Sequence, residues 1–132
     1  MMNKFGIHMT IDAKGSPSDL IDNETNIRNF VDSLVNRIEM TKYGDCVVKR
    51  FGKDPRLAGY SFFQLIEESN VSAHFCPYDY MMIDKNGKEY NNKGSSYIDI
   101  FSCKDYDPNI VLNVVNEFFK PTSYIYNVVD RY

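Results

Sequence analysis

Apolar and polar residues alternate along several short stretches of the chain, a pattern that predicts β-strands. The predicted strands cover residues 4–12, 45–51, 60–67, 70–75, 96–103 and 123–132. The clearest of them is "SYIDIFSC" at 96–103, where side chains point alternately to the two faces of a sheet. One face is expected to carry Tyr97, Asp99, Phe101 and Cys103, and the other Ile98 and Ile100.

Two segments instead repeat apolar residues at intervals of three and four, the period of an α-helix. The first begins after a cap at Asp22 or Asn23. Its apolar stripe is Ile27, Phe30, Val31, Leu34, Val35 and Ile38. The second begins with Asp107 as the N-cap and Pro108 in the first turn, and ends at Lys120. Its stripe is Val111, Val114, Val115 and Phe118.

This order of elements predicts an α+β fold. Each helix has a single apolar stripe, so both are expected on one face of a mostly antiparallel sheet, in a two-layer α/β sandwich. The length of 132 residues fits a single domain over 1–132, and the other face of the sheet could meet a second subunit. Residues 78–95 contain "DKNGKEY", whose Asn-Gly pair favours a tight hairpin turn, so this segment is predicted to leave the main sheet.

Composition and charge restrict the possible partners. The formal charge of −3 and the lack of a Lys/Arg cluster argue against nucleic acid and an anionic membrane surface. The sequence has neither an apolar run of membrane-spanning length nor a signal peptide, which predicts a cytoplasmic protein. The three cysteines form no CxxC pair, and only His8 and His74 could supplement them, so free thiols are expected and no metal site.

The stretch "LIEESNVSAHF" at 65–75 interrupts an apolar strand with polar residues. It could be a hairpin with a polar tip, or Ser69 could be a site at which the chain cuts itself. A tight hairpin would place Ser61 and His74 on the same face. A straight strand would separate Ser69 from His74 by about 16 Å, so proton transfer between them would require a bend in the chain.

Three segments in order resemble the S-adenosylmethionine decarboxylase proenzyme family in its small bacterial and archaeal form. They are "AGYSFFQLIEESNVSAHFCP", "SYIDIFSC" and a "DP" that opens a helix. The family pattern has a self-cleaving serine, a serine eight residues before it, a histidine five after it and a cysteine ending a later strand. Ser69, Ser61, His74 and Cys103 fill these positions, and His8 lies in a first strand as the family's "G-x-H" does. Asn70 replaces a histidine usual in bacterial members, and the 78–95 segment is longer than the usual link.

The resemblance implies cleavage between residues 68 and 69 and conversion of Ser69 into a covalent pyruvoyl cofactor. By the same resemblance, His74 removes a proton during elimination, Ser61 positions the intermediate of the acyl shift, and Cys103 returns a proton to the substrate. Phe51 could contact the substrate's sulfonium through its ring or could be a core residue. Glu68, once freed by cleavage, could bind the ribose.

The function implied is decarboxylation of S-adenosylmethionine for spermidine synthesis, by a homodimer of processed protomers with sites near the subunit interface. The pyruvoyl ketone would form a Schiff base with the substrate's amine and accept the electrons released with carbon dioxide. Two alternatives remain open at this point. One is a pyruvoyl-dependent decarboxylase of arginine or ornithine, and the other is an unprocessed relative with a binding or regulatory role.

Overall fold

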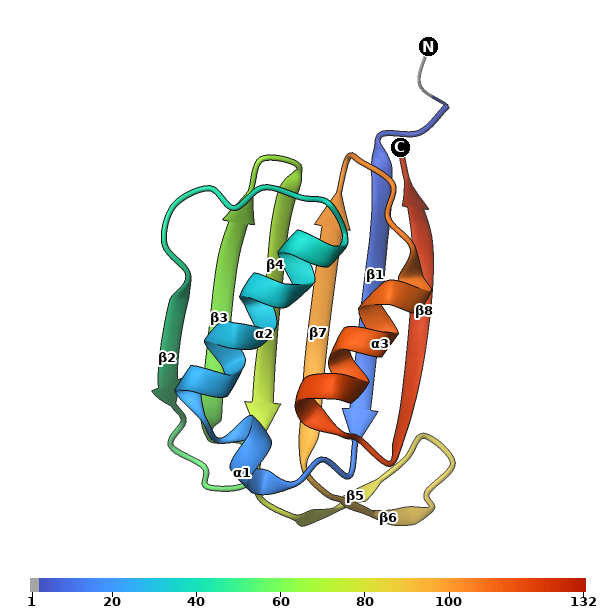
Figure 1. Cartoon of the computed structure of the whole chain (residues 1–132). Coiled ribbons are helices and arrows are strands. Elements are labelled where there is room, and N and C mark those ends of the chain that lie inside the picture. The colour runs from blue at the N-terminus through green and yellow to red at the C-terminus, as the bar shows by residue number, and fades with distance from the viewer. Residues whose placement is uncertain (1–2) are drawn as a thin grey trace.

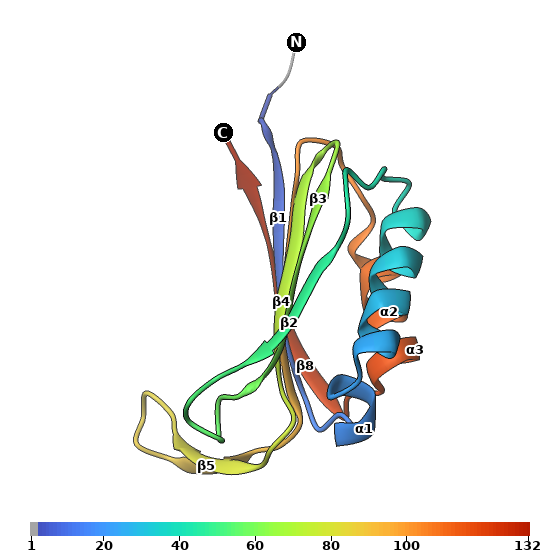
Figure 2. The ribbon, with the colours of Figure 1, turned by 90° about the vertical axis from the view of Figure 1, so that its left-hand side faces the viewer.

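A six-stranded antiparallel sheet carries helices on only one of its faces (Figures 1 and 2). The structure is a computed structural model that describes residues 3–132. The strands are β1 (Gly6–Lys14), β2 (Val47–Phe51), β3 (Gly59–Ile66), β4 (Ser69–Cys76), β7 (Ser95–Ser102) and β8 (Ser123–Arg131). Their spatial order is β2-β3-β4-β7-β1-β8, which confirms the predicted mostly antiparallel two-layer α+β sandwich.

Both predicted helices are present and capped by the expected side chains. In α2 (Glu24–Arg37) the Asn23 side chain accepts a hydrogen bond from the amide of Asn26. In α3 (Pro108–Phe119) the Asp107 side chain accepts one from the amide of Asn109. A third helix, α1 (Ser18–Ile21), is a single turn that the sequence analysis missed, because four residues do not establish a period.

The core fills the space between the sheet and the two longer helices. Phe30 of α2 and Phe119 of α3 are fully buried, with ring centroids 4.6 Å apart, and Phe75 of β4 lies 5.0 Å from Phe119. Ile98 and Ile100 face this core from β7, as the alternation predicted. The stripe predicted for α3 is wrong at one position, because Phe119 is fully buried and Phe118 only partly.

The opposite face of the sheet, here called the open face, carries no helix formed by the described residues 3–132. The strand registers arrange its side chains in rows across β3, β4 and β7. One row contains Ser61, His74 and Tyr97, the next Phe63, Ser72 and Asp99, and the third Leu65, Asn70 and Phe101. Large apolar side chains remain exposed there, including Phe63 and Leu65, so the open face is only partly polar.

The 78–95 segment leaves the main sheet as predicted and forms a separate hairpin of β5 (Tyr80–Ile83) and β6 (Glu89–Asn92). Its turn contains Gly87 at a φ of 80°, and the Asp84 side chain accepts hydrogen bonds from the amides of Asn86 and Lys88. Figure 2 shows this hairpin and the loop between β2 and β3 projecting on the open-face side. Together they form an overhang at the end of the sheet where β4 finishes.

Candidate active site

The bond between Glu68 and Ser69 lies at the start of β4, directly after the turn that connects it to β3. Ser69 has a φ of 154°, a conformation that costs a residue other than glycine about 1–3 kcal/mol. Its hydroxyl oxygen accepts a hydrogen bond of 3.2 Å from the Asn70 side chain. Backbone strain is therefore present at the bond that the sequence analysis selected.

The Glu68 carbonyl is bound by a backbone donor from a distant part of the sequence. The Cys103 amide, just beyond β7, donates to this carbonyl oxygen at a distance of 3.0 Å. The Glu68 carboxylate accepts a hydrogen bond from the Thr41 amide at 3.1 Å, which fixes the other end of the residue. A donor on the carbonyl oxygen stabilises the negative charge that develops there when a nucleophile attacks the carbonyl carbon.

Ser61 and His74 meet at the other end of β4. The Ser61 hydroxyl lies 2.6 Å from His74 Nδ1, and His74 Nε2 lies 2.8 Å from the Leu57 carbonyl oxygen. A carbonyl can only accept, so Nε2 carries the proton and donates it to Leu57. In the neutral imidazole Nδ1 is then the acceptor, and the Ser61 hydroxyl donates to it. The prediction that both residues share a sheet face is confirmed.

Further groups surround His74 on the open face. The Phe51 ring has its centroid 5.8 Å from that of the imidazole and is 57% exposed, which excludes the core role considered for it. Tyr97 is the cross-strand neighbour of His74, and its hydroxyl accepts a hydrogen bond of 2.7 Å from Lys14. This end of β4 therefore combines an imidazole, a hydroxyl, an ammonium group and an exposed aromatic ring.

The two ends of β4 remain apart within one chain. β4 runs without interruption from Ser69 to Cys76 and pairs continuously with both β3 and β7. The bend that the sequence analysis required between Ser69 and His74 is absent, and that expectation is wrong. Five residues of strand separate the two side chains by about 16 Å. Proton transfer between them in one chain is therefore excluded in this conformation.

The three cysteines differ in environment. Cys103 is exposed beside the Glu68 carbonyl, whereas Cys76 is buried and its thiol lies 3.7 Å from the Leu57 carbonyl oxygen. Burial raises the pKa of the Cys76 thiol, and it also raises that of Cys46. Cys103 is the exposed thiol of the three, so it is the accessible one near the candidate cleavage site.

Several contacting groups had not been identified from the sequence. Asn70 was noted only as a departure from the family pattern, yet it contacts Ser69. The Cys103 amide and the Leu57 carbonyl are backbone groups, which every residue has, so no residue type marks them. Lys14 and Tyr97 meet only because β1 and β7 are adjacent in the sheet.

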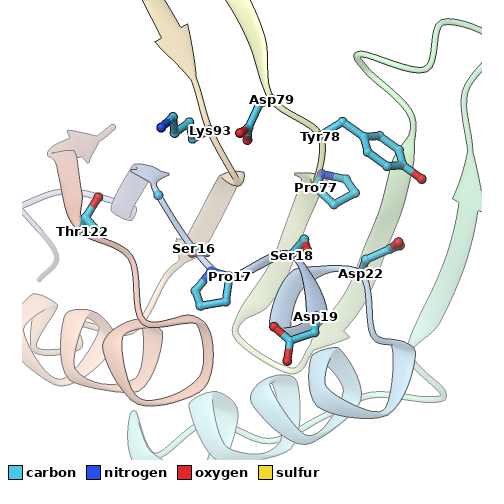
Figure 3. Close-up of a pocket in the computed structure, with 11 residues that line it drawn as sticks. Ser16, Pro17, Ser18, Asp19, Asp22, Pro77, Tyr78, Asp79, Lys93 and Thr122 are labelled. Carbon is cyan, nitrogen blue, oxygen red and sulfur yellow. The ribbon is translucent and has the colours of Figure 1, made fainter.

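A cavity of about 800 Å³ lies beside α1 and contains none of the predicted site residues (Figure 3). Asp19 and Asp22 of the α1 region, Asp79 and Lys93 contribute charged groups to its lining. Asp22 is already paired with Arg50 at 2.9 Å. The predicted site residues lie elsewhere, with Ser61 and His74 on the open face and the Glu68–Ser69 bond at the start of β4.

The chain is similar in sequence and in fold to known proteins. A family model described as S-adenosylmethionine decarboxylase matches residues 7–132. The S-adenosylmethionine decarboxylase proenzyme of Archaeoglobus fulgidus is 33% identical over 127 residues, which are 96% of each chain. The chain belongs to the S-adenosylmethionine decarboxylase family. The crystal structure of the adenosylmethionine decarboxylase of Aquifex aeolicus has the same fold, with a TM-score of 0.73 and 20% identity. That match covers 98% of this chain and 92% of the other.

Within residues 3–132, no cluster of three or more His, Cys, Asp or Glu side chains is arranged to hold a metal ion. Over the same described range, no helix combines the length and apolar character needed to span a bilayer.

Proposed function

We propose that this chain cleaves itself between Glu68 and Ser69 and then decarboxylates S-adenosylmethionine, which supplies the precursor for spermidine synthesis. Family membership supports the reaction, and one observation supports the cleavage site. The Glu68 carbonyl is hydrogen-bonded to the Cys103 amide, and the next residue, Ser69, has a strained backbone and a hydroxyl.

In the proposed cleavage, the Ser69 hydroxyl oxygen attacks the Glu68 carbonyl carbon. The peptide C–N bond breaks and an ester forms, and the Ser69 nitrogen becomes a free amine. The Cys103 amide stabilises the oxyanion formed during this step. Rearrangement also relieves the backbone strain at Ser69.

Elimination then requires a base that removes the α-proton of residue 69. The Glu68 carboxylate leaves, the resulting double bond rearranges to an imine, and water releases ammonia to give the pyruvoyl group. We assign the base to His74, whose Nδ1 faces the Ser61 hydroxyl and whose Nε2 is held by Leu57. Ser61 is assigned to positioning of the acyl-shift intermediate, as the resemblance implied.

His74 can serve as this base only if it comes from a second copy of the chain, because the two ends of one β4 are about 16 Å apart. We propose a homodimer in which two open faces pack together about a two-fold axis that runs across the strands. Such an axis places the Ser69 end of one β4 over the His74 end of the other. Exposed Phe63 and Leu65 on the open face supply apolar area for this contact.

The residues around Ser69 fit a pyruvoyl group. The group has no amine and no side chain beyond a methyl, and the side-chain amide of Asn70, which donates to the Ser69 hydroxyl before cleavage, is an adjacent donor that could bind it. The pyruvoyl ketone supplies an electron sink for decarboxylation when it is present. Cys103, exposed next to the cleaved bond, is assigned the return of a proton to the substrate carbon.

Two side chains are assigned to substrate binding. Phe51 lies beside His74 with an exposed ring face that can contact a sulfonium cation. The Glu68 carboxylate, at the cleaved end, can accept hydrogen bonds from ribose hydroxyls once cleavage frees the chain. Arginine and ornithine carry neither a sulfonium group nor a ribose, so these two contacts favour S-adenosylmethionine.

The intact mass of the purified protein tests this proposal directly. We expect two polypeptides, residues 1–68 and 69–132, with the second starting in a pyruvoyl group. Ser69→Ala should remain whole and inactive, whereas Ser72→Ala, two residues from His74 in β4, should be cleaved normally. A parent protein that keeps its full mass after long incubation would contradict the proposal and support a non-catalytic role. Carbon dioxide release from arginine or ornithine but not S-adenosylmethionine would change the substrate.

A further inference from the structure

The Lys14 side chain places an ammonium group beside the nearest neighbour of the proposed base. In the sheet, β7 lies between β4, which carries His74, and β1, which ends at Lys14 (Figure 1). Tyr97 of β7 is the cross-strand neighbour of His74. The Lys14 ammonium donates to the Tyr97 hydroxyl at 2.7 Å and to the Ser95 hydroxyl at 3.4 Å. It is therefore held at the His74 end of the open face.

Backbone contacts fix the position from which this side chain extends. The Lys14 carbonyl oxygen accepts a hydrogen bond from the Thr122 amide at 2.9 Å, and the Gly15 amide donates to the Lys93 carbonyl oxygen at 2.7 Å. Lys14 also pairs with Ser123 at the end of the β1–β8 register. The ammonium therefore belongs to the rigid end of a strand, where a charge can be aimed at a reacting group in advance.

The ammonium is half-buried and surrounded by neutral donors and acceptors. Within residues 3–132, both side chains to which it donates are hydroxyl groups. Over this described range Lys14 forms no ion pair, although Asp12 lies opposite Tyr97 in the register of β1 and β7. A charge partly removed from water is stabilised by an opposite charge, so this position favours an anion.

Tyr97 supplies a second donor at the same place. Its hydroxyl oxygen accepts from Lys14 and from the Asn92 side chain, which lies at 3.4 Å. These two bonds use both lone pairs, so the hydroxyl proton can be donated to an anion. Asn92 is only 1% exposed and accepts from the Ser95 hydroxyl at 2.8 Å, which holds it in place. An ammonium and a hydroxyl together match the two oxygens of a carboxylate.

We propose that Lys14 and Tyr97 bind the carboxylate that leaves during the elimination step of self-cleavage. The inference rests on the proposed function and its two-chain site, in which His74 of one chain acts on residue 69 of the other. After the acyl shift, an ester joins the Glu68 carbonyl carbon to the Oγ of residue 69. His74 removes the α-proton, and the electron pair of that C–H bond forms the Cα–Cβ double bond. The Cβ–Oγ bond breaks, and its electron pair stays on Oγ, which becomes an oxygen of the Glu68 α-carboxylate.

The direction of charge change favours this carboxylate over that of the substrate. The leaving group gains negative charge in the transition state, so an ammonium that binds it accelerates elimination. The substrate's carboxylate loses its charge as carbon dioxide departs, so the same ammonium would stabilise the ground state and slow the reaction. Both sources offer the same chemical group, and the experiment below distinguishes them.

The test follows Lys14→Met by intact mass, with neutral hydroxylamine as the probe for the ester. Hydroxylamine cleaves an ester, and the fragment 69–132 that it releases begins with serine, whereas elimination gives a pyruvoyl group. Lys14→Met should slow elimination by about 10²-fold, so the ester accumulates and the serine fragment increases. Lys14→Arg retains the positive charge and should stay within about tenfold of the parent.

Two further variants keep the test independent of the folding of Lys14→Met. Tyr97→Phe removes one donor and should slow elimination about three- to tenfold, again with ester accumulation. Lys85→Met removes an exposed lysine from the β5–β6 turn and should react at the parental rate. Co-expression of Lys14→Met with the Ser69→Ala chain, which retains Lys14, should restore elimination in mixed dimers.

Elimination at the parental rate in both Lys14→Met and Tyr97→Phe would overturn the inference, as would slow cleavage without ester. If elimination is unchanged but KM for S-adenosylmethionine rises, Lys14 binds the substrate's carboxylate and the assignment to the leaving group is wrong. A lack of restoration in mixed dimers would also contradict it. A parent chain that never cleaves would contradict the proposed function itself, and the inference with it.

Discussion

The two ends of β4 are built from different kinds of contact. At the Ser69 end the important groups belong to the backbone: a strained φ, the Glu68 carbonyl and the Cys103 amide. At the His74 end they are side chains, with Ser61 on one imidazole nitrogen and a single backbone carbonyl on the other. In the proposed mechanism the first arrangement prepares the Glu68–Ser69 bond for cleavage, and the second holds the base, His74, in one tautomer.

In the proposed mechanism, neither end is an active site by itself. In the proposed mechanism the Ser69 end contributes the nucleophile and the oxyanion donor, and the His74 end contributes the base. A straight β4 keeps them apart in one chain. In the proposed dimer the two chains would run in opposite directions, and each would contribute one end of β4 to each of two sites.

The largest expected effect comes from placing the Ser69 and His74 substitutions in different chains of the same dimer. His74→Ala alone should slow cleavage by about 10²- to 10⁴-fold, the usual contribution of a general base, and Ser69→Ala alone should abolish it. When the two variants are co-expressed with different tags, the His74→Ala chain should be cleaved and the Ser69→Ala chain should stay whole. Intact mass of the mixed dimers measures both chains at once.

The single variants serve as controls for this mixing experiment. If the mixed protein shows no more cleavage than His74→Ala alone, the base and the nucleophile must act within one chain. That result would require a conformation in which β4 bends, and it would remove the proposed two-chain site.

Cys103→Ser should separate the backbone role of this residue from its side-chain role. The amide that binds the Glu68 carbonyl is retained, so we expect normal self-cleavage. Loss of the thiol should slow decarboxylation by about 10²-fold and cause progressive inactivation during turnover. Mass spectrometry measures the first effect and a time course of carbon dioxide release the second.

Cys46→Ser is the matched control, because Cys46 is a partly buried thiol away from the cleavage site and should have no effect on either measurement. Parental turnover by Cys103→Ser, without inactivation, would show that the proton comes from another group.

A smaller effect is expected from Ser61→Ala at the His74 end. The substitution removes the donor to Nδ1, but the Leu57 carbonyl still holds Nε2. Loss of one such hydrogen bond corresponds to about a three- to tenfold slower cleavage, followed by intact mass over time. Ser72→Ala, on the same face and next to the same row, should be cleaved at the parental rate. Equal rates for both variants would rule out a positioning role for Ser61.

The smallest effect concerns Phe51. Phe51→Leu keeps an apolar side chain but removes the π face beside His74. The expected rise in KM for S-adenosylmethionine is about two- to fivefold, the usual contribution of an exposed cation–π contact. Phe63→Leu, another exposed aromatic of the open face, is the control in steady-state assays. If both substitutions raise KM equally, Phe51 has no specific contact with the sulfonium.

The sequence alone determined the local elements. The apolar stripe from Ile27 to Val35, the caps Asn23 and Asp107 and the alternation in 96–103 each specify structure within a few consecutive residues. The register of the β3–β4 hairpin, which places Ser61 opposite His74, was predictable for the same reason. A tight turn fixes which residues of the two strands pair. The Asn-Gly turn of the β5–β6 hairpin was also a local signal.

Only the tertiary structure decided what lies around the cleavage site. β7 inserts between β4 and β1, and this pairing of distant segments brings the Cys103 amide to the Glu68 carbonyl. The same pairing holds β4 straight from Ser69 to Cys76, which overturned the expected bend. It also places Lys14 on Tyr97 and directs the β5–β6 hairpin to the open-face side. Contacts of this kind depend on which strands become neighbours, and that choice is made by burial of the whole core rather than by any short stretch of residues.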